Sequence, residues 1–141
     1  MTKYFELIAE SKSLPEFRKE LRSLLVSAGW NEETLGQILV AIDEALTNVI
    51  RHAYQGNPGK IKIIFEDNPL QTEIIIEDHG TKFDPTKIPE PELPPQKPGG
   101  LGIHFIRTIM DAMIYDSDYQ EGNRIHLIKK KAKISKREGV L

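Results

Sequence analysis

Between His79 and Pro98 the chain carries six of its nine prolines and shows no apolar periodicity. Proline lacks a backbone N–H and fixes φ, so this stretch can form neither an α-helix nor a hydrogen-bonded strand. A folded core must therefore come from the residues on either side. We predict a mobile loop here, with residues 81–98 acting as a lid over a binding site, although a disordered insertion would explain the same composition.

The residues before this stretch predict three strands and two helices. Ser13 and Glu16 have the spacing of a capping box, so a first helix is expected to begin there and to end near Gly29. Asn31 is a suitable N-cap for a longer second helix that reaches about Tyr54. The predicted strands are residues 3–9, 60–66 and 72–78, and the last two form a hairpin of central strands.

The residues after the stretch predict a helix from Ile103 to about Met113, then strands over 114–119 and 124–132, with a charged tail over 133–141 that is expected to fray. No internal repeat is present. We predict a single domain, residues 1–141, with its core at about 5–131. The order of elements favours the α/β (α+β) class, as a two-layer sandwich of one mixed β-sheet with helices on one face.

The amino-acid composition disfavours nucleic acid and membranes as binding partners. Nineteen Lys and Arg against 21 Asp and Glu give a net charge of −2, so no basic excess points to nucleic acid or to a membrane surface. The sequence has no cysteine, no run of 18 apolar residues and no secretory leader, which together favour a soluble cytoplasmic protein. The four histidines match no zinc spacing, so no zinc site is expected.

Glu44, Asn48 and Arg51 follow one another at helical spacing and therefore share one face of the second predicted helix. A carboxylate can orient or deprotonate a nucleophile, and a carboxamide oxygen suits Mg²⁺, which takes few protein ligands beside phosphates. Arg51 is placed to meet a phosphate oxygen. Taken alone, the same three residues also fit an ordinary solvated helix face.

Asp78 ends an isoleucine-rich strand and is followed by His79 and Gly80, so its carboxylate emerges from apolar surroundings, where it can accept the exocyclic amine of adenine. An Asx-type turn is the plain alternative. Residues 99–105, Gly-Gly-Leu-Gly-Ile-His-Phe, open a helix whose backbone N–H groups can approach an anion. This segment is neither a Walker A loop nor a Rossmann fingerprint, and a glycine-rich hinge has the same composition.

Together these three segments resemble the N box (residues 44–54), the G1 box (78–80) and the G2 box (99–102) of the GHKL superfamily, which has the Bergerat fold. Arg51-His52-Ala53-Tyr54 and the later Ile109-Met110-Asp111 are similar to the anti-sigma factor serine kinases in particular. The resemblance covers about residues 5–131. No phosphoaccepting histidine precedes the N box, so a complete histidine kinase is disfavoured.

The resemblance implies roles residue by residue. Glu44 would be the catalytic base, Asn48 the Mg²⁺ ligand, and Asp78 and Gly80 the adenine contacts. The full nucleotide-binding set that it implies is Asn48, Arg51, His52, Asp78, Gly80, Phe83, Gly99, Gly100, Leu101, Gly102 and Ile103. Two departures stand out, because the G1 box lacks its second glycine and Asn123 replaces a threonine often found near the adenine.

The function implied is that of an ATP- and Mg²⁺-dependent kinase that phosphorylates a Ser or Thr of a STAS-type anti-anti-sigma partner, acts as an anti-sigma factor toward a sigma factor, and forms a homodimer. Two alternatives stay open. One is an ATP-gated binding module with negligible phosphotransfer. The other is a regulator that sequesters a sigma factor or activates a phosphatase, with any kinase activity incidental.

Overall fold

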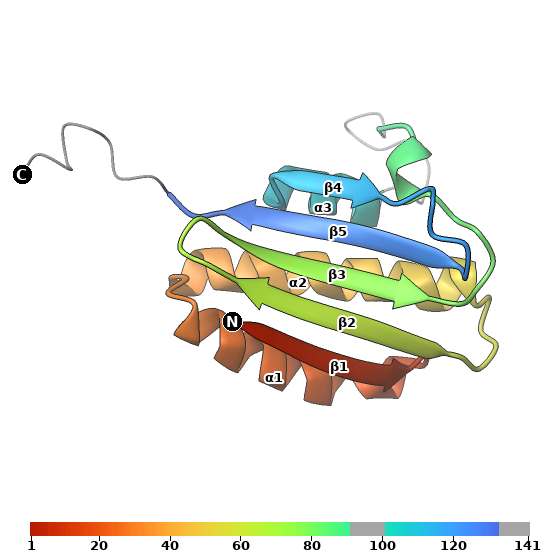
Figure 1. Ribbon diagram of the computed structural model, residues 1–141, viewed down its shortest axis with the longest axis horizontal. Helices are drawn as coiled ribbons and strands as arrows, with labels where there is room; N and C mark the ends of the chain where they lie inside the picture. The colour runs from red at the N-terminus through yellow and green to blue at the C-terminus, as the bar shows by residue number, and fades with distance from the viewer. Residues whose placement is uncertain (91–100, 133–141) are drawn as a thin grey trace, which may run out of the picture.

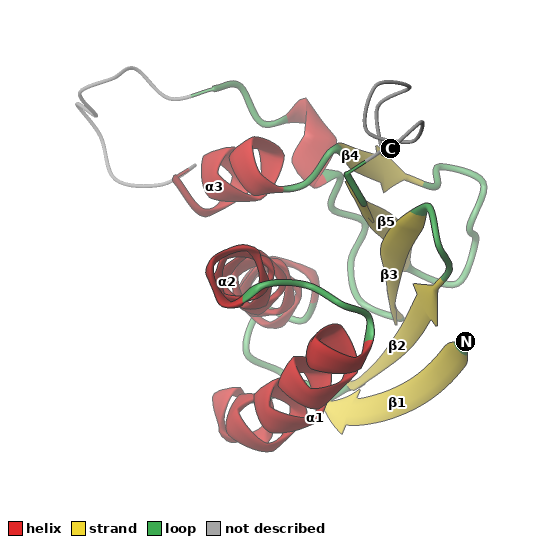
Figure 2. Ribbon diagram, turned by 90° about the vertical axis from the view of Figure 1, so that its left-hand side faces the viewer, coloured by secondary structure: helices red, strands yellow, loops and turns green. Residues whose placement is uncertain are grey.

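A computed structural model describes residues 1–90 and 101–132, and this part of the chain forms a five-stranded β-sheet with three α-helices on one face (Figures 1 and 2). The predicted two-layer α/β sandwich is thus confirmed. The strands are β1 (Thr2–Ile8), β2 (Lys60–Asp67), β3 (Gln71–Asp78), β4 (Ala112–Tyr115) and β5 (Asn123–Lys130). The α-helices are α1 (Leu14–Ser27), α2 (Glu32–Asn48) and α3 (Leu101–Ile109).

The strand order is β1-β2-β3-β5-β4, and every described pairing is antiparallel. The prediction of a mixed sheet was therefore wrong in this respect. The crossover through α3 does make β3 and β4 run in the same direction, but β5 lies between them and separates the two parallel strands (Figure 1). The prediction that β2 and β3 form a hairpin of central strands is confirmed.

The two predicted helix caps had different outcomes. Asn31 caps α2 as expected, because its Oδ1 accepts the backbone N–H of Thr34 at 2.8 Å. Ser13 makes no side-chain cap bond. The reason is local, since a 3₁₀ turn at Ser11–Ser13 runs directly into α1 and gives Ser13 helical angles (φ −77°, ψ −18°) instead of the extended backbone that an N-cap needs.

Several element boundaries also differ from the expectations. The last helix begins and ends earlier than predicted, at Leu101 and Ile109, and the strand after it is the short β4 at Ala112–Tyr115 rather than 114–119. The described part of the proline-rich stretch includes a 3₁₀ turn, η3 (Pro85–Lys87), which Asp84 caps by accepting the N–H of Thr86 at 2.9 Å. The remainder of the predicted lid, 91–98, and the whole predicted tail, 133–141, lie outside the described residues.

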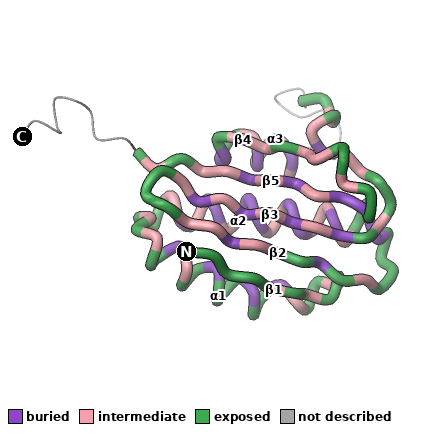
Figure 3. The backbone as a smooth tube through the Cα atoms, in the orientation of Figure 1, coloured by how far each residue is buried: buried purple, intermediate pink, exposed green. Residues whose placement is uncertain are grey.

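The core lies between the sheet and the helices (Figure 3). Alternate residues of β2 and β3 point inward, and α2 lays an apolar stripe over them at helical spacing. All of these side chains are at most 1 % exposed: Ile61, Ile63, Phe65, Ile74, Ile76, Leu35, Ile38, Ile42 and Leu46. This burial supplies the main stabilisation of the fold and leaves the end of β3 anchored in a rigid layer.

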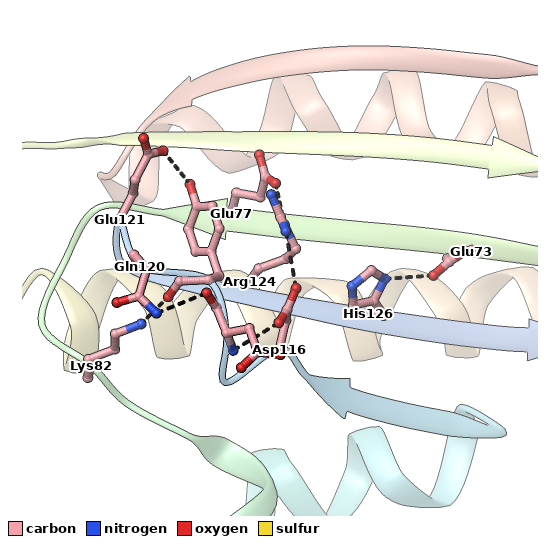
Figure 4. Close-up of polar contacts among 10 residues, drawn as sticks. Glu73, Glu77, Lys82, Asp116, Gln120, Glu121, Arg124 and His126 are labelled. Carbon is pink, nitrogen blue, oxygen red and sulfur yellow. Dashed lines mark hydrogen bonds and ion pairs between the residues drawn. The ribbon is translucent and has the colours of Figure 1, made fainter.

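Within residues 1–90 and 101–132, no helix covers the other face of the sheet, which carries a polar network (Figure 4). Arg124 on β5 donates to Glu77 on β3 (2.5 Å) and to Asp116 (3.1 Å). Its guanidinium also lies 4.2 Å from the centre of the Tyr119 ring. The hydrogen bond from Arg124 lowers the pKa of Asp116. These contacts fasten β5 to β3 and to the loop after β4, and so fix the strand ends that bear the site described next.

Candidate functional site

A pocket with about 410 Å³ of empty space, open solvent included, lies between the sheet and the helices α2 and α3, at the edge where β3 and β4 end and β5 begins. Most of its walls are apolar, from residues such as Ala45, Ile76, Ile103, Ile106, Met113 and Ile125. Four polar side chains converge on it: Asn48, Asp78, Tyr115 and Asn123. An apolar pocket with a few converging polar groups is the usual form of a small-molecule site.

Asp78 is the last residue of β3 and is only 1 % exposed. Its Oδ1 accepts the backbone N–H of Gly80 at 2.8 Å and the Nδ2 of Asn123 at 2.9 Å. Burial raises the pKa of Asp78, while these hydrogen bonds and the charge of His79 oppose the rise. The result is a buried carboxylate, held by two donors, at the rim of an apolar pocket.

Gly80 lies against the end of the helical segment that follows α2. A Cβ at this position would stand 2.5 Å from the carbonyl oxygen of Ala53, and the next residue, Thr81, donates its N–H to that same oxygen at 2.8 Å. The glycine thus lets the loop after β3 dock on the helix. This is a packing role that the motif did not reveal, and the contact of Gly80 with adenine stays a prediction.

We expect Gly80→Ala to destabilise the protein by about 1 to 3 kcal/mol, because the added methyl group must displace backbone. Gly36→Ala is the matched control, since a Cβ at Gly36, within α2, meets nothing within 4 Å. Alanine there should instead stabilise the helix by up to about 1 kcal/mol. Urea unfolding of both variants measures the difference. Equal stability of the two would contradict the proposed docking.

A second, more polar cleft joins the first pocket, and Asn48 and Ile103 line both. Glu44, Thr47, Arg51, His52 and Gly102 complete the polar cleft, with Ile88 and Leu101 at its sides. Seven predicted site residues therefore line this one cleft: Glu44, Asn48, Arg51, His52, Leu101, Gly102 and Ile103. Asp78 and Phe83 line the adjoining apolar pocket. Gly99 and Gly100 lie outside the described residues.

Glu44 lies directly against the first turn of α3. A Cβ on Gly102 would collide with Oε2 of Glu44, so the glycine allows this carboxylate to approach the helix backbone. The N-terminus of a helix carries a partial positive charge and favours a neighbouring carboxylate. This contact brings residues from the predicted N box and the predicted G2 box together at one place.

The helix does not end at Asn48 but continues as a π-helical turn, Val49–Ala53, which contains Arg51 and His52. Such turns are rare and occur often at functional sites. The His52 ring stacks on the ring of Phe83, with centroids 4.6 Å apart and an interplanar angle of 20°. This contact ties the π turn to the loop after β3, so the two predicted motifs support each other sterically.

The amide of Asn48 is a test of whether the site suits Mg²⁺. Its Nδ2 is buried and has no hydrogen-bond partner among the described residues, so this amide donor is left unsatisfied there. Across residues 1–90 and 101–132, no three His, Asp or Glu side chains gather in a way that would hold a metal ion by themselves. Mg²⁺ would bind the amide oxygen of Asn48 rather than Nδ2, and it takes most of its other ligands from phosphate and water.

Three residues that organise the site were not assigned a role from the sequence. Tyr54 bridges two strands, donating to the carbonyl of Lys60 (2.5 Å) and accepting the N–H of His79 (2.8 Å). Tyr115 donates to Oδ1 of Asn123 (2.5 Å). From the sequence, Asn123 is only a departure from the motif. Nothing in the local sequence shows these bonds, because they join segments that are distant along the chain.

Among the described residues, no helix combines the length and apolar character needed to span a membrane.

Comparison with known proteins places the chain in a family. Residues 7–129 match a protein family that is described as "Histidine kinase-like ATPase domain". The curated protein "Serine-protein kinase RsbW" of Oceanobacillus iheyensis is 34% identical, over 82% of this chain and 80% of that protein. Proteins of the same name are 29% identical in Listeria innocua (91% and 88% covered) and 30% identical in Bacillus licheniformis (77% and 74%). The chain therefore belongs to the histidine-kinase-like ATPase family, the GHKL superfamily, among relatives that are serine-protein kinases.

Proposed function

We propose that this chain is an ATP-dependent serine/threonine protein kinase that acts as an anti-sigma regulatory factor in the cytoplasm. Its substrate would be a Ser or Thr hydroxyl of a STAS-type anti-anti-sigma protein. The observation that carries the proposal is the junction of two sites at Asn48, an apolar pocket that ends at Asp78 and a polar cleft that contains Glu44. A flat base and a charged phosphate chain require this pair of environments.

In the apolar pocket, adenine would lie between the sheet and the helices, with its exocyclic amine donating to Asp78. The apolar walls exclude water, so this one hydrogen bond acquires a large weight in selecting the base. In the polar cleft, Arg51 and the backbone N–H groups at the start of α3 would face the phosphates. Asn48, between the two, would hold Mg²⁺, whose charge when bound offsets that of the phosphates.

Phosphotransfer in this arrangement requires a partner hydroxyl beside Glu44. The hydroxyl oxygen forms a bond to the γ-phosphorus while the bond from that phosphorus to the bridging oxygen of ADP breaks. The hydroxyl proton passes to the Glu44 carboxylate. Glu44 would thus act as general base, and its contact with Gly102 at the first turn of α3 supports a position close to the proposed phosphate site.

The regulatory partners follow from the same proposal. Phosphorylation of the STAS-type protein would change whether this chain binds that protein or a sigma factor, and a homodimer would be the working form. The experiment that tests the proposal is mass spectrometry of STAS proteins from the same genome after incubation with this protein and Mg·ATP. One phosphorylated Ser or Thr supports it. Nucleotide binding without phosphorylation would instead identify an ATP-gated binding module.

Mg·ATP or Mg·ADP is expected to stabilise the folded protein strongly, because the nucleotide contacts come from segments that meet only in the fold. At a nucleotide concentration 100 times its dissociation constant, linkage gives about 2.7 kcal/mol. For a chain of this size the melting temperature should rise by about 5 to 10 °C. Differential scanning fluorimetry measures the shift, with Mg²⁺ alone as the control. No shift with either nucleotide would refute ATP binding.

A further inference from the structure

Asn123, the first residue of β5, uses every hydrogen-bonding position of its side chain. Its Nδ2 donates to Oδ1 of Asp78 (2.9 Å) and to the backbone carbonyl of Thr81 (2.9 Å). Its Oδ1 accepts from the backbone N–H of Phe83 (2.8 Å) and from the hydroxyl of Tyr115 (2.5 Å). The side chain is also buried, with only 6 % of the residue exposed. Asn123 thus joins the ends of β3 and β4 to the loop after β3.

Chemistry fixes the orientation of this amide. The carbonyl of Thr81 can only accept a hydrogen bond, so the atom that faces it must be the nitrogen. The N–H of Phe83 can only donate, so the atom that faces it must be the oxygen. A 180° flip would break the hydrogen bonds to Thr81 and Phe83 and would set the amide oxygen against the carboxylate of Asp78. The donor that Asn123 presents to Asp78 is therefore fixed in place.

The consequence falls on the carboxylate of Asp78. Oδ1 is occupied by two donors, Gly80 and Asn123. The backbone N–H of Asn123 also hydrogen-bonds to this carboxyl group. The bonds from Gly80 and from the Asn123 side chain both end on Oδ1, so a ligand would take Oδ2. Asn123, in contrast, has no hydrogen-bonding position left for a ligand.

We propose that Asn123 is a positioning residue that makes the pocket selective for a 6-amino purine, by holding Asp78 with one oxygen turned toward the base. This inference rests on the proposed nucleotide-binding function. A 6-amino group can donate to the free oxygen, whereas the 6-oxo group of hypoxanthine presents an acceptor and leaves two acceptors facing each other. Asn123 would act on selectivity only through Asp78 and would not touch the base.

The charge state of Asp78 gives an independent readout. Burial raises the pKa of this carboxyl, and the hydrogen bond from Asn123 is the largest influence that lowers it. The other titratable groups whose charges interact with it are His79, Tyr54 and Tyr115. Loss of the Asn123 amide therefore raises the pKa of Asp78 further. A protonated Asp78 can donate to a 6-oxo group, so selectivity should fall in step with protonation.

The test compares the affinities of ADP and of inosine diphosphate for the wild-type protein and for Asn123→Ala, by calorimetry across a range of pH. We expect the ratio of ADP to inosine diphosphate affinity to fall about tenfold in the variant, as loss of one hydrogen-bond partner in a buried pair predicts. Acidification should also begin to weaken ADP binding at a higher pH. Protonation of the nucleotide itself affects both proteins equally, so it does not contribute to the difference between their pH profiles.

Tyr119→Phe is the control. It removes a hydrogen-bonding group from the loop between β4 and β5, close to Asn123 in the chain, but the Tyr119 hydroxyl contacts only Glu121 among the described residues and not Asp78. It should keep the wild-type ratio and pH dependence. An equal loss of both nucleotides in Asn123→Ala, with an unchanged ratio and pH midpoint, would overturn the proposal and leave Asn123 as a wall of the pocket. Wild-type binding of ADP tests the proposed function separately.

A measurement on the wild-type protein decides the matter if Asn123→Ala does not fold. The NMR signals of the Asn123 side-chain amide should shift as Asp78 titrates, with the midpoint at which ADP affinity falls. Addition of ADP should leave this amide protected from solvent exchange. An amide that exchanges freely, or one whose signals do not follow that midpoint, would overturn the proposal.

Discussion

Replacing Glu44 by glutamine is expected to leave Mg·ATP affinity close to the wild-type value and to lower the rate of phosphotransfer by about 10²- to 10⁴-fold. Glutamine preserves the shape of the side chain against Gly102 but cannot take the hydroxyl proton. The measurement is single-turnover phosphorylation of a STAS-type partner, with nucleotide affinity determined on the same protein. A variant that phosphorylates the partner at the wild-type rate would exclude Glu44 as the base.

Asn48→Ala is the companion variant, and the two must diverge. Asn48 lines both the apolar pocket and the polar cleft, and its buried Nδ2 has no hydrogen-bond partner among the described residues. Its removal should weaken Mg·ATP binding as well as turnover, because the proposed Mg²⁺ ligand is lost. If the two variants behave alike in both assays, the assignment of Glu44 as base and Asn48 as metal ligand is wrong.

Asp78→Asn is expected to reduce ADP affinity at least about tenfold while the free protein keeps or gains stability. Asparagine can keep an oxygen facing Gly80 and Asn123, which places its nitrogen where the free carboxylate oxygen lies. A donor then faces the amine of adenine, a buried mismatch that costs about 1 to 3 kcal/mol. Calorimetry measures the affinity, and unchanged ADP binding would reduce Asp78 to a turn residue.

The stability part of this prediction follows from the sign of the pKa shift. Burial raises the pKa of Asp78 in the folded protein above its ordinary value of 3.8. The stabilising contribution of this group is therefore complete below pH 3.8 and is lost as the pH rises through the folded-state pKa. At neutral pH the ionised carboxylate is a cost to folding that neutral asparagine removes. Thermal melts of the ligand-free proteins at neutral pH check this.

Local signals in the sequence predicted the elements well. The β-branched runs gave β2 and β3, and Asn31 gave the start of α2, because each depends on residues that are neighbours in the chain. Ser13 failed as a cap for an equally local reason, since the 3₁₀ turn before it competes with the extended backbone. Short β4 was misplaced because four residues carry little periodic signal.

The site could be predicted only as a set of separate motifs. The spacing of Glu44 and Asn48 put them on one helix face, and the structure brings that face against Gly102. The hydrogen bonds of Asn123 could not be predicted, because its four partners come from strands and loops whose proximity depends on strand order. The same strand order is what the mixed-sheet prediction missed.

The insertion of β5 between β3 and β4 also has a consequence for folding during synthesis on the ribosome. Until residue 130 has been synthesised, β3 lacks its neighbour on one side and exposes unpaired N–H and C=O groups. Asp78 then lacks the amide of Asn123 as well. The nucleotide site is therefore completed last. A chain interrupted before Asn123 would offer a quality-control protease or a chaperone an open strand edge, with no ligand able to rescue it.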